Sequence, residues 1–221
     1  MLNPLLMMTI LAVVFSNIMR MNIKNYAVYL FSGSIIWTYF NYTVLVSLGA
    51  IRANATIMSQ VNVPHYIFPL SAAFSALVDL FFSVIPLVLI MLFLGHGMSL
   101  NILTLPIILI PLFFFTMGIS LIVATGNIFF EDTSHLTNVA LQALYFLCPI
   151  LYMRDMLPPW LTKYIVLNPL FCLVEFGHDL FFFGRLPNPS TFTYVFVGSL
   201  VTLVLGLYLS LIHISEPTRP Y

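Results

Sequence analysis

Three ionisable residues, Asp79, Glu175 and His178, lie within apolar stretches, where their chemistry would matter most. Asp79 falls near the middle of the apolar run 67–94, and a charged group at the centre of a bilayer costs roughly 2.5 to 3.5 kcal/mol on insertion scales. We expect Asp79 to face the interior of the helix bundle. There it either lines a polar path or takes part in a hydrogen bond with a neighbouring helix, and both roles stay open.

Glu175 and His178 have the Glu-x-x-His spacing of di-metal helical bundles. Such a site needs a second copy of the motif and further carboxylates, so we expect no metal. An intramembrane enzyme that uses these two residues with Asp79 is one alternative, but no nucleophile and base stand at a recognisable spacing. No glycine-rich phosphate loop occurs, so any ATP and its Mg²⁺ must be bound by another chain, and we expect no cofactor on this one.

Aromatic residues are concentrated within two helical turns of the apolar run 26–50, at Trp37, Tyr39, Phe40 and Tyr42. A ring with a flat apolar face and a polar tip is suited to stacking against a sugar. Aromatic belts also occur at both interfaces of any membrane protein, so the same pattern permits a purely structural role.

The composition is that of an integral membrane protein. Hydrophobic residues make up 61% of the 221 residues and charged residues 6%, which leaves more apolar surface than a soluble domain could bury. The formal net charge is zero, so nothing indicates a nucleic-acid partner. Cys148 and Cys172 both stand in apolar surroundings. We expect buried thiols, and a disulfide between them remains possible.

Six apolar runs approach or exceed the roughly 20 residues that a helix needs to cross a bilayer. They cover residues 4–19, 26–50, 67–94, 102–130, 136–153 and 191–212. The alternating pattern of residues 52–64 predicts a short helix along the membrane surface, ended by Pro64. Prolines and charges interrupt residues 145–170, which predicts a re-entrant or interfacial region. The predicted fold is therefore an all-α integral membrane protein with six transmembrane helices and this region between the fifth and the sixth.

An ordered series of motifs runs along most of the chain: LNPLLMM, LFSGSIIW, NATIMSQVNVPHYIFPLS, NIFFEDTSH, LCPILYM, LPPW and LNPL. From Leu2 to about Pro187 the series resembles the type-2 ABC exporter permeases, which move lipid-linked polysaccharides such as O-antigens, capsules and teichoic acids. The resemblance implies a permease homodimer in the bacterial inner membrane, a lipid-linked glycan as substrate and separate ATPase subunits. A related permease for a small drug or lipid is the alternative.

The resemblance also bears on the ends of the chain. The family's amphipathic helix before the first span has no counterpart here, so we expect a truncated amino terminus. Residues 1–209 form the predicted transmembrane permease domain. The final segment, residues 210–221, departs from the preceding pattern and resembles translated sequencing-adapter read-through. We expect it to be a non-native tail.

Two segments, residues 54–69 and 127–132, match the cytoplasmic surfaces on which the family's ATPase docks. The implied coupling residues are Asn54, Ile57, Val61, Val63, Pro64, His65, Tyr66, Glu131 and Asp132. The family often has a basic residue where Gln60 or Asn62 stands, an arginine near His65, and an arginine in place of Glu131. These differences leave no specific ion pair with the ATPase to predict.

The translocation path and its external cap are the other implied regions. The predicted path residues are Trp37, Tyr39, Tyr42 and Asp79. Residues 149–187 match the external re-entrant helices that cap the family's channel, with Pro149, Trp160, Asn168 and Pro169 as cap residues. The family topology places Arg52 inside and places Arg20, Lys24, Arg154, Lys163 and Arg185 outside. This reverses the positive-inside expectation, so we take the orientation from the resemblance.

Overall fold

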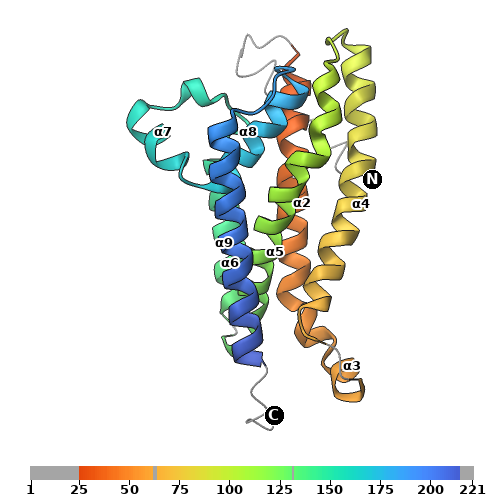
Figure 1. Cartoon of the computed structure of the whole chain (residues 1–221), viewed down its shortest axis with the longest axis vertical. Helices are drawn as coiled ribbons and strands as arrows, with labels where there is room; N and C mark the ends of the chain where they lie inside the picture. Colours follow the sequence, from red (N-terminus) through yellow and green to blue (C-terminus); the bar gives the residue numbers. More distant parts are fainter. Residues whose placement is uncertain (1–24, 62–63, 131, 215–221) are drawn as a thin grey trace.

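The computed structural model describes residues 25–61, 64–130 and 132–214, which form a bundle of helices (Figure 1). In chain order the elements are α2 (Tyr26–Ala53), α3 (Ala55–Gln60), α4 (Ile67–Phe93), the 3-10 helix η1 (Leu100–Thr104), α5 (Leu105–Phe129), α6 (Thr133–Leu147), the 3-10 helix η2 (Arg154–Met156), α7 (Pro159–Ile165), α8 (Pro169–Phe181) and α9 (Pro189–Ile214). All regular structure in the described residues is helical, which confirms the predicted all-α class.

Four helices are long and apolar enough to cross a membrane: α2, α4, the continuous segment Leu100–Phe129, and α9 as far as Ile212. They confirm the predicted runs 26–50, 67–94, 102–130 and 191–212 to within a few residues. The first predicted run, 4–19, lies outside the described residues. Together α7 and α8 make a fifth candidate, bent by 103° as in a broken span or a re-entrant loop. Six spans therefore stay a prediction.

The predicted run 136–153 forms a shorter helix than its apolar length suggests. α6 ends at Leu147, and Cys148 turns to an extended conformation immediately before Pro149. The ring of a proline disfavours helical geometry at the residue that precedes it. The 15 residues of α6 extend for about 22 Å at 1.5 Å per residue. That length is less than the roughly 30 Å of hydrocarbon in a bilayer, so α6 alone does not cross it.

Local sequence signals determine where several helices begin and end. Gly95, with φ +63°, follows the end of α4, and the amide of His96 donates to Met91 O at 2.8 Å in a Schellman arrangement. The first residues of α7 and α8 are prolines, a position where the missing N–H costs nothing. Asn168 caps α8, because its Oδ1 accepts a hydrogen bond from the amide of Leu170 at 3.0 Å.

The central helix of the bundle is α2, which contacts α4, α5, α6 and α8. Glycines permit the closest approaches between helices. A Cβ on Gly118 of α5 would lie 2.5 Å from the carbonyl oxygen of Thr202 on α9, and a Cβ on Gly33 of α2 would lie 2.5 Å from Cε1 of His178 on α8. By contrast, only 22% of the most apolar stretch of α4, and 22% of that of α9, is buried inside the chain. These two helices therefore form outer walls of the chain.

The two ends of the bundle differ (Figure 1). At the lower end α3 connects α2 to α4, and α5 ends close to the start of α6. At the opposite end η2 and α7 extend sideways from the bundle before the chain returns through α8 to α9. The short helix predicted within residues 52–64 is confirmed as α3. The predicted coupling and cap segments thus lie at opposite ends of the molecule.

Candidate functional site

At the α3 end, two side chains connect the last turns of α2 and α5. Nδ2 of the buried Asn127 donates a 2.7 Å hydrogen bond to Leu48 O. Nη2 of Arg52 donates to Ile128 O at 3.2 Å. The last carbonyls of a helix lack partners within the helix, so a cation at Ile128 O is favourable. These two bonds join the end of α2 to the end of α5.

The predicted coupling residues of the α3 segment lie at the same end of the molecule as this junction (Figure 1). Asn54 follows α2 and donates to Ala50 O at 2.7 Å. Val61 and Pro64 are exposed, whereas Tyr66 is half-buried beside the first turn of α4. Burial lowers the pKa of His65, because it disfavours the charged form of the imidazole.

The remaining coupling residues are only partly described. Ile57 belongs to α3, but its side chain lies outside the described part of the structure, as do Val63 and Glu131. Asp132 is exposed at the N-cap position of α6, where its side chain makes no capping hydrogen bond. Its carboxylate therefore does not cap the helix.

At the opposite end, a polar cluster joins α2, α8 and the break after α6. His178 is buried and stacks on Tyr29 with the ring centroids 3.8 Å apart and the planes 4° from parallel. Its Nε2 lies 2.9 Å from Pro149 O, and its Nδ1 lies 2.9 Å from Oγ of Ser32. A carbonyl oxygen only accepts, so we assign the neutral tautomer with the proton on Nε2.

Tyrosine hydroxyls donate hydrogen bonds to backbone carbonyls in the break after α6. The hydroxyl of Tyr29 lies 3.1 Å from Pro149 O and 2.7 Å from Tyr152 O, and Tyr26 donates to Leu151 O at 2.7 Å. Non-helical backbone at membrane depth needs such partners. We call the side chains of Tyr26, Tyr29, Ser32 and His178, with the carbonyls of Pro149, Leu151 and Tyr152, the cap latch. Sequence reasoning missed the latch because its members lie far apart in the chain.

Ion pairs and buried thiols surround the latch. Glu175 pairs with Arg154 at 3.2 Å, and Asp179 pairs with Arg185 at 2.7 Å. Glu175 and His178 of the Glu-x-x-His motif thus have separate partners. In residues 25–61, 64–130 and 132–214, no three His, Cys, Asp or Glu side chains form a group that could hold a metal. Cys148 and Cys172 are buried free thiols, as expected.

The predicted path residues are not brought together. Trp37 and Tyr39 are buried in the core, where Trp37 packs edge-on against Tyr145 at 5.4 Å. Tyr42 is exposed. The expectation that Asp79 faces the interior is wrong for the bundle of one chain, because Asp79 lies on the exposed face of α4. Apolar length placed Asp79 at mid-span, but it could not fix which face of the helix points inward.

A polar stripe on α6 is a second feature that sequence reasoning missed. Of the residues in α6 only Thr137 and Leu141 are buried. The exposed side chains of His135, Asn138 and Gln142 are spaced three and four apart, so they lie on one face of the helix. The signal was present in the sequence, as polar residues at helical spacing in an otherwise apolar run.

The long apolar helices, the broken segment and the two distinct ends together define a multi-pass membrane protein. Residues 1–182 match the family model described as "ABC-2 type transporter". The chain is 33% identical over 204 residues to an O-antigen export system permease protein RfbA of Klebsiella pneumoniae, covering 91% of this chain and 78% of that protein. Against the protein of that name from Myxococcus xanthus it is 26% identical over 205 residues, covering 91% of this chain and 78% of the relative.

The chain therefore belongs to the ABC-2 type transporter family. It is a permease subunit and not an enzyme, and ATP hydrolysis takes place on a separate ATPase subunit. Cap residue Pro149 lies in the latch, and Asn168 and Pro169 begin α8, whereas Trp160 is exposed on α7. The cap and coupling roles of individual residues stay predictions.

Proposed function

We propose that this chain is the permease subunit of an ATP-driven exporter of lipid-linked polysaccharide in the bacterial inner membrane. It acts as a homodimer with two ATPase subunits. The names of the relatives support an O-antigen type of glycan. The family membership supports the ATPase partner.

The observation that carries the mechanism is the position of α2, which has contacts at both ends of the molecule. Its last turns bond to α5 through Asn127 and Arg52, and its first turns supply Tyr26, Tyr29 and Ser32 to the cap latch. The 28 residues of α2 form a rod about 42 Å long at 1.5 Å per residue. Closure of the ATPase against α3 would move this rod, loosen the latch and open the channel beneath the cap.

The α6 stripe supports a dimer with a polar path between the copies. His135, Asn138 and Gln142 are exposed along a helix that packs loosely on its own chain. Polar side chains facing hydrocarbon are unfavourable, so membrane helices direct them toward a cavity or another helix. A second copy placed against α6 would enclose this stripe and supply hydrogen-bonding groups to a passing sugar chain. Tyr42 stays a candidate path residue. Asp79 lies on the exposed face of the outer helix α4, and its role in the path stays a separate prediction that this arrangement does not use.

Deletion of residues 59–63 tests the proposed coupling. ATPase closure can shift the permease only if its contact with the α3 segment differs between the two states. The deletion should therefore abolish the stimulation of ATP hydrolysis by lipid-linked polysaccharide in proteoliposomes, while circular dichroism retains the helical signal. Stimulation of normal size in the deletion variant would contradict the proposal.

A further inference from the structure

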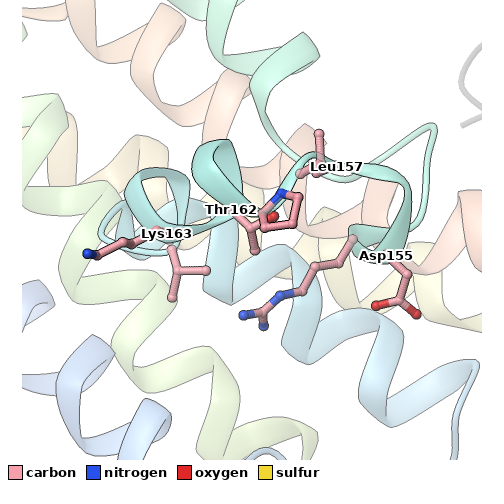
Figure 2. A pocket seen from close by; sticks show the side chains of 7 residues that line it. Asp155, Leu157, Thr162 and Lys163 are labelled. Atoms are coloured by element: carbon pink, nitrogen blue, oxygen red, sulfur yellow. The ribbon is translucent and has the colours of Figure 1, made fainter.

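An open cleft of about 460 Å³ lies between η2 and α7 at the cap end. Its lining residues are Arg154, Asp155, Leu157, Pro159, Thr162, Lys163 and Val166. Figure 2 shows Lys163 and Asp155 on opposite sides of this cleft. The cleft thus combines apolar side chains with two cations, one carboxylate and a hydroxyl group.

The cations in the cleft are incompletely neutralised. Arg154 contacts Glu175 through Nη1 alone, at 3.2 Å from Oε2 and 3.4 Å from Oε1. The Nε and Nη2 donors of the same guanidinium stay available for a second acceptor. Lys163 forms no ion pair with any residue in the described part of the chain. Asp155 adds a carboxylate on the side of the cleft opposite Lys163 (Figure 2), and like charges repel, so an anion is favoured nearer to Lys163.

The outer surface of α7 has the composition of a membrane interface. Trp160 and Tyr164 are each 66% exposed, and they are spaced four residues apart on one face. Lys163 lies between them in sequence and is also exposed. Tryptophan and tyrosine gather at the level of the lipid headgroups, where an apolar ring with a polar edge is most stable. In Figure 1 α7 stands beside the bundle rather than within it, so this face is open to the surroundings.

We infer that the cleft binds the phosphate group of an anionic phospholipid from the surrounding leaflet. Arg154 and Lys163 donate to the phosphate oxygens, and Trp160 and Tyr164 insert beside the upper acyl chains. Lys163, which has no carboxylate partner among the described residues, favours an anionic headgroup over a zwitterionic one. The inference requires only that the chain is a membrane protein, and it does not depend on the exported glycan. Bound lipid would hold α7 at a fixed depth and so position the cap.

Fluorescence of Trp160 tests this inference in the full chain reconstituted with its ATPase. The chain has two tryptophans, so Trp37→Phe leaves Trp160 as the only tryptophan of this chain, and the signal of the same complex carrying Trp160→Phe as well is subtracted to remove fluorescence from the ATPase. Brominated phosphatidylglycerol should quench Trp160 at a severalfold lower mole fraction than brominated phosphatidylcholine. Arg154→Gln and Lys163→Gln should each weaken this preference about fivefold, because a cation near an anionic lipid surface contributes about 1 kcal/mol.

Arg185→Gln is the matched control, since Arg185 is an exposed cation at the same end of the chain but outside the cleft. It should leave the preference unchanged. Equal quenching by the two lipids, or an equal loss in the control, would overturn the inference. If inorganic phosphate in the buffer removes the preference, the cleft takes free phosphate and the lipid assignment is wrong. Circular dichroism of every variant identifies any loss of fold.

Discussion

At the scale of single residues, the cap latch replaces the hydrogen bonds that the chain gives up where α6 ends. Tyr29 and His178 both contact Pro149 O, and Tyr29 also bonds to Tyr152 O. A buried carbonyl without a partner costs roughly 1 to 3 kcal/mol. The rings of Tyr29 and His178 also stack on each other, with their centroids 3.8 Å apart. These bonds therefore stabilise the break in the chain after α6, and they depend on only four side chains.

Tyr29→Phe removes the hydroxyl from the latch and keeps the ring. Tyr152 O loses its bond to Tyr29, while Pro149 O keeps its bond to His178. We expect the free energy of unfolding to fall by roughly 1 to 2 kcal/mol, and Tm to fall by a few degrees. Tyr164→Phe is the control, because Tyr164 is exposed on α7 and its hydroxyl bonds to no described residue. Thermal unfolding in detergent measures both, and equal Tm values for the two variants would contradict the latch.

At the scale of helices, α6 differs from its neighbours in having two different exposed surfaces. The polar stripe of His135, Asn138 and Gln142 lies beside exposed apolar residues, including Leu136 and Val139. A helix in contact with lipid on every side would not retain such a stripe. The arrangement is suited to a helix at the boundary between two copies of the chain and an aqueous path.

Cross-linking tests this placement of α6. In a background with both native cysteines replaced by alanine, Asn138→Cys should form a disulfide-linked dimer on oxidation in membranes. Val78→Cys, on the exposed face of the outer helix α4, should stay monomeric under the same conditions. Gel electrophoresis without reductant separates the two forms. A dimer band that appears for position 78 and not for position 138 would place the interface elsewhere.

The same helices mark the limit of prediction from sequence. Apolar length predicted four spans to within a few residues, because bilayer thickness fixes that length. It overestimated α6, since the residues after Leu147 are apolar but Pro149 prevents helix there. Apolar length also could not predict that Asp79 is exposed, because this exposure depends on which face of α4 packs against α2. The Ser32–His178 contact was out of reach because it joins residues 146 positions apart.

At the scale of the whole molecule, the proposed ATPase contact and the proposed cap lie at opposite ends, with α2 connecting them (Figure 1). The cations Arg154, Lys163 and Arg185 all lie at the cap end. The structure gives each of the two arginines a carboxylate partner, and the proposed lipid site gives a role to Lys163. In the proposed orientation, with the cap end outside, these contacts would stabilise cations on the side that the positive-inside expectation disfavours.

Labelling of Cys148 tests the connection between the two ends most directly. Cys148 is fully buried beside the latch, and Cys172→Ala leaves it as the only thiol among the described residues. With the ATPase present, we predict that ATP raises the rate of maleimide labelling of Cys148 severalfold, and that deletion of residues 59–63 removes this rise. Slow labelling that is unchanged while ATP is being hydrolysed would contradict the account.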